Sequence, residues 1–163
     1  MGVRFDSDLH VAGSITCEEL DIPAGSLVDA DVAAGAAISA TKLMHQHSPN
    51  YSQPNTTATS ETRILHTVYG ATGTITAFKA GSIVLNIGAA TVTVDLRKNG
   101  TTVLTGVITL DTANTAYTPE AATILSASVV AGDVLSVVIT ATAGGGTLAT
   151  GFYCYAIITE AGA

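Results

Sequence analysis

Strict alternation of apolar and polar residues constrains this chain more than any other feature. In Thr91–Leu96 the valines and the leucine fall on one face of an extended chain, and threonine and aspartate fall on the other. Successive side chains of a β-strand point to opposite sides, so this pattern predicts a half-buried strand. Val103–Leu110 continues it in part. Asn99-Gly100 lies between the two segments and predicts a tight hairpin turn, because both residues tolerate positive φ.

The remainder of the C-terminal part has the same character. Turn signals at Ala131-Gly132-Asp133 and Gly144-Gly145-Gly146 separate apolar segments, and no segment has the length and periodicity of an amphipathic helix. Many short strands joined by regular turns are typical of a sandwich. We therefore expect an all-β fold, an antiparallel two-sheet sandwich that is jelly-roll-like. The expected strands are 62–69, 73–79, 82–87, 90–98, 101–110, 123–130, 133–142 and 148–159.

The first part of the chain differs in composition. Residues 1–47 contain few large apolar residues and many alanines, which predicts an extended N-terminal arm and oligomerisation segment without a core of its own. Residues 48–61 contain two prolines and many hydroxyl and amide groups, which predicts a linker. The sandwich domain is then expected over 62–163. We expect these apolar residues of the arm to contact a partner surface or sister chains: Phe5, Leu9, Val11, Ile15, Leu20, Ile22, Leu27, Ile38 and Leu43.

Charge is sparse and mostly negative. The formal net charge is −7, and charged residues make up 12% of the chain. Proteins that bind nucleic acid carry a basic face, and the few lysines and arginines here form no cluster, so we expect no nucleic-acid partner. No stretch approaches the roughly 18 apolar residues of a membrane span, so we expect no membrane association. The first residues lack the apolar core of a signal peptide, which predicts synthesis in a cytoplasm.

The sequence meets no catalytic template. It contains no Gly-x-Ser-x-Gly, His-Glu-x-x-His or Cys-x-x-Cys motif. Asp95, Asp111 and Asp133 fall at turns, strand ends or exposed faces, where structural or solvated roles are expected. Cys154 lies in an apolar segment and is expected to pack as a small core residue. We therefore predict that the protein is not an enzyme and carries no organic cofactor.

His45 and His47 are a candidate metal site. In an extended strand residues i and i+2 share a face, so both imidazoles are expected to point the same way. Three chains around a three-fold axis would supply enough imidazoles for an octahedral Fe²⁺, Ni²⁺ or Co²⁺ ion, whereas zinc prefers tetrahedral sites. The alternative is that both histidines form an exposed polar lead-in to the linker. His10 and His66 stand apart in the sequence, with no evident partner.

The segment Phe152–Ile158 is apolar on both faces. Such a strand is either central in a sandwich or covers a subunit interface. Tyr153 and Tyr155 are expected to point the same way, and their hydroxyls can reach water or a partner while the rings pack. We favour a subunit interface for that face.

Several stretches resemble known phage proteins. Asp29–Leu43 resembles a segment of many tailed-phage virion proteins, fibres and head decorations alike. Val92–Leu104, followed by Ala131–Leu135, is similar to the sandwich domains of phage capsid decoration (cement) proteins and head fibres. Together with the pattern of Phe5–Gly25, the resemblance covers most of the chain.

The resemblance to the tailed-bacteriophage capsid decoration family implies a homotrimer on the capsid exterior. Such a protein contacts the major capsid protein where capsomers meet and stabilises the shell against internal DNA pressure. The resemblance implies no catalytic residues. An acidic extended arm and a weakly charged β domain suit a clamp, because multivalent contact slows dissociation. The alternative is a tail-fibre or head-fibre module that binds a receptor or glycan.

Overall fold

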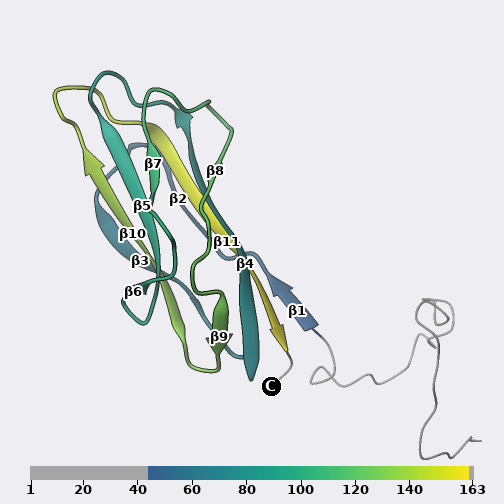
Figure 1. Cartoon of the computed structure of the whole chain (residues 1–163). Helices are drawn as coiled ribbons and strands as arrows, with labels where there is room; N and C mark the ends of the chain where they lie inside the picture. Colours follow the sequence, from purple (N-terminus) through teal and green to yellow (C-terminus); the bar gives the residue numbers. More distant parts are fainter. Residues whose placement is uncertain (1–43, 162–163) are drawn as a thin grey trace, which may run out of the picture. The chain divides into compact units, whose positions relative to one another are not determined.

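The computed structural model describes residues 44–161, which form two antiparallel β-sheets packed face to face (Figure 1). The predicted all-β two-sheet sandwich is therefore confirmed. The six-stranded sheet contains β1 (Met44–His47), β2 (Asn50–Thr57), β4 (Thr72–Val84), β8 (Glu120–Ala121), β9 (Ser128–Val130) and β11 (Thr150–Ala161). The five-stranded sheet contains β3 (Glu61–Thr67), β5 (Thr91–Lys98), β6 (Thr101–Thr102), β7 (Ile108–Leu110) and β10 (Val134–Thr142).

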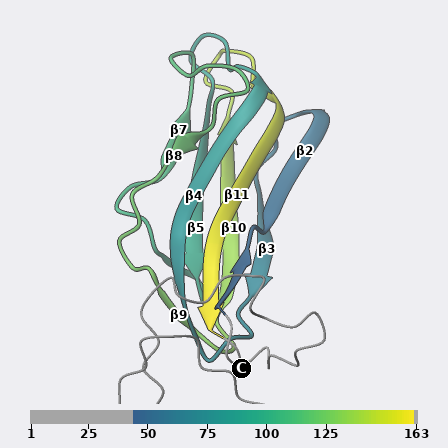
Figure 2. The same cartoon turned by 90° about the vertical axis from the view of Figure 1, so that its right-hand side faces the viewer.

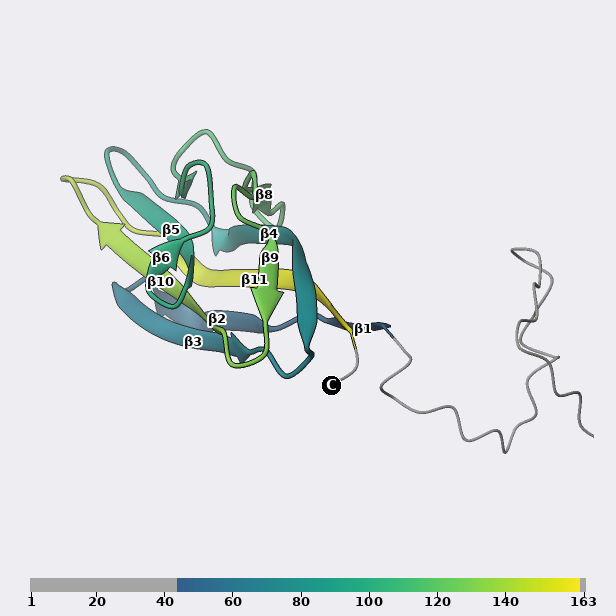
Figure 3. The same ribbon diagram turned by 60° about the horizontal axis from the view of Figure 1, so that its bottom comes forward.

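The order of the strands is that of a jelly roll. In one sheet β11 lies between β4 and the successive strands β1 and β2, and β4 continues to β8 and β9. In the other sheet β10 lies between β3 and β5, and β5 continues to β6 and β7. The chain therefore crosses between the sheets repeatedly, and its last two strands pair with its first three. Figure 3 shows the two layers from a lower viewpoint.

Alternating side chains fill the space between the sheets. Val92, Val94 and Leu96 are buried, as the alternation in Thr91–Leu96 predicts. Phe78 and Phe152 are fully buried and come from the two central strands of the opposite sheet. Burying side chains of this size contributes about 1.5–3 kcal/mol each. The residues of β5 that are buried in the core thus include those that the alternating pattern predicts.

The predicted Asn99-Gly100 hairpin turn is present between β5 and β6. Asn99 has φ 50° and Gly100 has φ 86°, so both residues adopt the left-handed conformation that a type I′ turn requires. The Asn99 side chain also joins the neighbouring turn: its Nδ2 donates to Asp133 Oδ1 at 2.7 Å, and its Oδ1 accepts from Val134 N at 2.9 Å. Asp133 is structural, because it also accepts from Val130 N.

The expected linker over 48–61 is wrong for most of its length. Residues Asn50–Thr57 form β2, which pairs with β11 from Tyr155 back to Thr150. The sandwich therefore starts before residue 62, and β1 belongs to it as well. β2 is polar because it is an edge strand whose inward side chains, Tyr51 and Gln53, bond to the facing sheet. Pro54 is tolerated at such an edge.

Both ends of the described chain lie at the same end of the sandwich. Met44, the first residue of β1, pairs with Ala161, the last residue of β11. The loops 85–90, 111–119 and 143–149 lie at the opposite end (Figures 1 and 2). Among residues 44–161 there is no helix that could cross a membrane.

The predictions for the N-terminal arm before Met44 lie outside the described residues. This applies to the expected contact residues Phe5, Leu9, Val11, Ile15, Leu20, Ile22, Leu27, Ile38 and Leu43.

Candidate functional site

The outer face of β11 carries the residues predicted to form a subunit interface. Tyr153, Tyr155 and Ile157 are half-buried and alternate with fully buried residues that enter the core. The two tyrosines therefore do point the same way, out of the sandwich. Tyr155 lies between Lys79 of β4 and Asn50 of β2. This row of large side chains lies on the middle strand of the six-stranded sheet.

The ring of Tyr153 lies against Gly81 of β4. A Cβ atom on Gly81 would lie 2.7 Å from the Tyr153 hydroxyl and 3.2 Å from Pro119 Cα. The ring therefore rests directly on the backbone of β4, and only glycine leaves the space. Burial, and the neighbouring Tyr155, raise the pKa of the Tyr153 hydroxyl. Tyr153 is a neutral side chain laid flat on the sheet, which suits it to contact with another flat apolar surface.

His45 and His47 share one face of β1, as predicted. Their ring centroids are 6.4 Å apart, and the rings are stacked. They pair with Glu160 and Ile158, which are buried, so both histidines lie on the inward side of the sheet at its edge. The His47 ring lies 5.2 Å from the ring of His66 in β3. The third imidazole of this row comes from the other sheet.

No metal centre is evident within the described part of one copy of the chain. Among residues 44–161, no group of three or more His, Cys, Asp or Glu side chains is arranged to hold a metal ion. The predicted octahedral site on a trimer axis needs imidazoles from several copies, so it stays a prediction. His45 and His47 would be its ligands.

Glu160 is the most deeply buried charged residue of the sandwich. Only 2% of its surface is exposed. Its Oε2 accepts from Tyr69 N at 3.0 Å and from Gly70 N at 2.8 Å, and its Oε1 contacts Nε2 of His66. Burial alone raises the pKa of this carboxyl, but the bonds from Gly70, His66 and Tyr69 outweigh it, so the pKa lies below its ordinary value. Glu160 thereby joins β11 to β3 and to the loop after it.

A second polar cluster joins β2 to β3 farther along the same edge. Glu61 accepts from the Tyr51 hydroxyl, from Gln53 Nε2 and, at 2.6 Å, from Arg63 Nε. Gln53 is buried, and it also bonds to the backbone of Thr59 through both its oxygen and its nitrogen. The hydrogen bond from Tyr51 is the main reason that the pKa of Glu61 is lowered. We call the two clusters together the polar seam: Tyr51, Gln53, Glu61, Arg63, His47, His66 and Glu160.

Asp95 and Cys154 have structural roles. Asp95 accepts from Arg97 Nε at 2.8 Å and from the Thr102 hydroxyl at 2.6 Å, which fixes the strand before the hairpin. Cys154 is buried in the core, as predicted, and burial raises the pKa of its thiol to about 12. Such a thiol is protonated at neutral pH and is a poor nucleophile.

Sequence reasoning missed the partners of His66 and the role of Glu160. One signal was available: Glu160 occupies an inward position of β11, in phase with Phe152, Cys154 and Ile158. A carboxylate in phase with core residues is stable only if other groups satisfy it. The sequence could therefore have indicated a buried polar site, although not its donors.

No protein-family model matches the chain, and no curated protein matches its sequence.

Proposed function

We propose that the protein is a structural component of a phage virion that binds the outer surface of the capsid as a homotrimer and stabilises the shell. One observation carries this proposal: Met44 and Ala161 are paired at one end of the sandwich, opposite the loops 85–90, 111–119 and 143–149. Residue 43 is therefore attached to the sandwich at this end. A module joined in this way can be anchored through that end while the other end projects outward.

The arm supplies the contacts in this proposal. Its apolar residues, from Phe5 to Leu43, contact the major capsid protein or sister chains. Many small contacts to several subunits at once make dissociation slow, because all of them must be broken together. The protein is made in the host cytoplasm and ends on the capsid exterior. Neither nucleic acid nor a membrane is a partner.

The outer face of β11 supplies the trimer contact. Tyr153, Tyr155 and Ile157 form a row on the middle strand. Gly81, which lies opposite Tyr153 on β4, has no side chain, so no side chain projects over the Tyr153 ring at that position. Aromatic side chains of this kind are enriched at protein interfaces. The proposal also keeps His45 and His47 as ligands of a shared octahedral metal; because both lie on the inward side of edge strand β1, the metal belongs to that edge and not to the tyrosine row.

Deletion of residues 1–43 tests the anchor. Within residues 44–161 the buried hydrophobic core runs from Ala58 to Ile158, so the shortened protein should keep its fold and its cooperative thermal transition. It should fail to co-sediment with capsids that bind the full chain. The proposal is wrong if the shortened protein, shown to be folded by circular dichroism, still decorates capsids.

Copy number separates this proposal from its alternative. A decoration protein is present at hundreds of copies on each particle, whereas a tail-fibre or head-fibre module that binds a receptor or glycan is present at few. Quantitative gel analysis of purified particles measures this ratio directly. A low copy number, with protein located on fibres by electron microscopy, would support the fibre alternative.

Metal analysis tests the shared site independently. Protein purified without a histidine tag should contain one transition-metal ion for every three chains, and the double substitution His45→Gln, His47→Gln should remove it. Fewer ions than this in the unsubstituted protein would exclude the metal without excluding capsid binding.

A further inference from the structure

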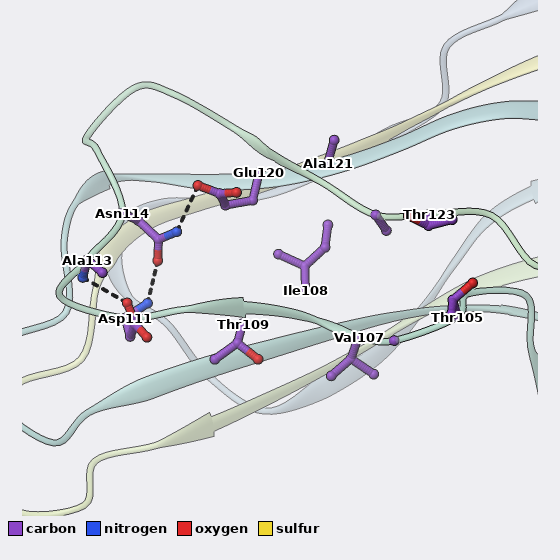
Figure 4. Close-up of a pocket in the computed structure, with 12 residues that line it drawn as sticks. Thr105, Val107, Ile108, Thr109, Asp111, Ala113, Asn114, Glu120, Ala121 and Thr123 are labelled. Atoms are coloured by element: carbon purple, nitrogen blue, oxygen red, sulfur yellow. Dashed lines mark hydrogen bonds between the residues drawn. The ribbon is translucent and has the colours of Figure 1, made fainter.

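A groove opens along the edge of the sandwich where β7 of one sheet faces β8 of the other. Its volume is about 600 Å³, within the range of small-molecule sites. One end is closed where Thr105 N donates to Thr123 O at 3.0 Å and where Leu104 bridges to Ile124. The loop that follows Asp111 borders the other end (Figure 4). The groove is therefore a short, bounded depression.

Hydrogen bonds hold the polar groups at the loop end in place. Asn114 Oδ1 accepts from Asp111 N, and Asn114 Nδ2 donates to Glu120 Oε1 at 3.0 Å (Figure 4). Asp111 Oδ1 accepts from Ala113 N at 2.8 Å. Within residues 44–161, no hydrogen bond occupies Asp111 Oδ2 or Glu120 Oε2. Two acceptor oxygens are thus already positioned, so a ligand need not order them on binding.

The rest of the lining alternates apolar and hydroxyl groups. Ile108 lies between the two strands in Figure 4, and the half-buried Ala122 belongs to the same lining. Thr105, Thr109 and Thr123 belong to the same lining. Apolar carbon beside fixed acceptors and hydroxyls matches a molecule that has both C–H faces and many hydroxyl groups.

The charge of the groove narrows the class of ligand. No lysine, arginine or histidine of the described chain lines it, and neither Asp111 nor Glu120 forms an ion pair there. Carboxylates without a cation repel phosphates and acidic sugars but accept hydrogen bonds from hydroxyls. A peptide strand fits less well, because β7 has three residues and β8 has two, which offer few backbone hydrogen bonds. We infer that the groove binds a short neutral oligosaccharide.

A methyl-labelled full chain tests this inference. The δ1 methyl signal of Ile108 reports on the groove, and that of Ile64, which is 70% exposed on β3, serves as the internal reference. The probes are neutral maltotriose, cellotriose, lactose, mannobiose and chitobiose, with 3′-sialyllactose and trilysine as charged comparisons. Each is added to about 20 mM, above the millimolar Kd of a weak complex. At least one neutral probe should shift Ile108 saturably and leave Ile64 unchanged.

Matched variants locate the site. Asn114→Ala and Glu120→Ala should each raise the Kd of the neutral probe by about tenfold, because each removes a fixed polar group. Asn50→Ala changes an exposed asparagine of β2, outside the groove, and should leave the Kd unchanged. Thermal melts confirm that all three variants are folded.

The outcomes are distinct. Saturable shifts at Ile108 that both groove variants weaken support the inference, and lactose should bind more tightly than 3′-sialyllactose. No shift with any neutral probe overturns it. So does binding of trilysine alone, which would indicate a basic peptide, and so do neutral-probe shifts that Asn114→Ala and Glu120→Ala leave unchanged. None of these outcomes depends on attachment to a capsid.

Discussion

The two long edges of the sandwich differ in how the two sheets meet. At the edge formed by β1, β2 and β3, the polar seam joins the two sheets through carboxylates that accept several hydrogen bonds each. At the edge formed by β7 and β8, the strands separate beyond Thr105 and leave a groove. Both edges carry glutamate and amide side chains. What differs is the burial of those groups.

This difference shows that polar composition alone does not determine whether an edge stabilises the fold or binds a ligand. Glu160 is almost completely buried, and its bonds are to backbone and imidazole groups of the fold itself. Glu120 is exposed and is bonded on one oxygen only. A buried polar group must be satisfied within the protein, whereas an exposed one can bond to water or a ligand. The polar seam therefore stabilises the fold, whereas the groove can bind a ligand.

Removal of the two glutamate side chains should give the largest contrast. Glu160→Ala leaves Tyr69 N and Gly70 N without their acceptor and opens a cavity, so we expect a loss of about 3 kcal/mol or more in the free energy of unfolding. Glu120→Ala should change it by less than about 0.5 kcal/mol. Urea unfolding of both variants measures the difference. Equal losses would show that the edges do not differ as described.

The two amides should show the same contrast at a smaller scale. Gln53 is 4% exposed and bonds to Thr59 and Glu61, so Gln53→Ala should cost about 2 kcal/mol. Asn114→Ala should cost about 1 kcal/mol or less, because water can replace its bonds. Thermal unfolding ranks the two variants, and a larger loss for Asn114→Ala would contradict the assignment of the seam as the structural edge.

Acid should weaken the seam through its carboxylates. The pKa values of Glu160 and Glu61 are lowered in the folded protein from an ordinary value of 4.5. Their stabilising contribution is therefore complete above that value and is lost as the pH falls through the lower folded-state pKa. Urea unfolding between about pH 6 and pH 3 should show this decline, and Glu160→Gln should reduce its slope. Parallel curves for both proteins would exclude Glu160 as a cause.

The exposed member of the seam should matter least. The Arg63 side chain is 57% exposed, lies 5.6 Å from the centre of the Tyr51 ring and pairs with Glu61. Exposed ion pairs contribute little, so Arg63→Ala should lower the free energy of unfolding less than any other substitution in the polar seam. A loss near that of Gln53→Ala would mean that charge, rather than burial, holds this edge.

Most of the sandwich could be predicted because its signals are local. Asn99-Gly100 specifies its turn by backbone preference alone, and the alternation in Thr91–Leu96 specifies which side chains are buried. These features depend on neighbouring residues, which the sequence displays directly. The number and spacing of the expected strands indicated a two-sheet sandwich, but they do not contain the order of the strands within each sheet.

The polar edge strand could not be predicted in the same way. Tyr51 and Gln53 are stable in β2 because Glu61 and Thr59 lie beside them in the folded chain. Hydrophobic periodicity does not register such a strand, so 48–61 resembled a linker. The meeting of His47 with His66, and the groove between β7 and β8, also depend on how the two sheets are stacked. No spacing within the sequence contains that information.

The pairing of Met44 with Ala161 has a mechanical consequence. β1 and β2 both lie along β11, and Met44 is at the end where residue 43 attaches. A pull on residue 43 along the strand axis, resisted at the far loops, makes these strands slide against β11. The hydrogen bonds that β1 and β2 form with β11, along the stretch from Met44 to Thr57, then carry the load at the same time and not one after another. A pull on the tether therefore acts along the strands, which is the direction in which a β-sheet resists force best.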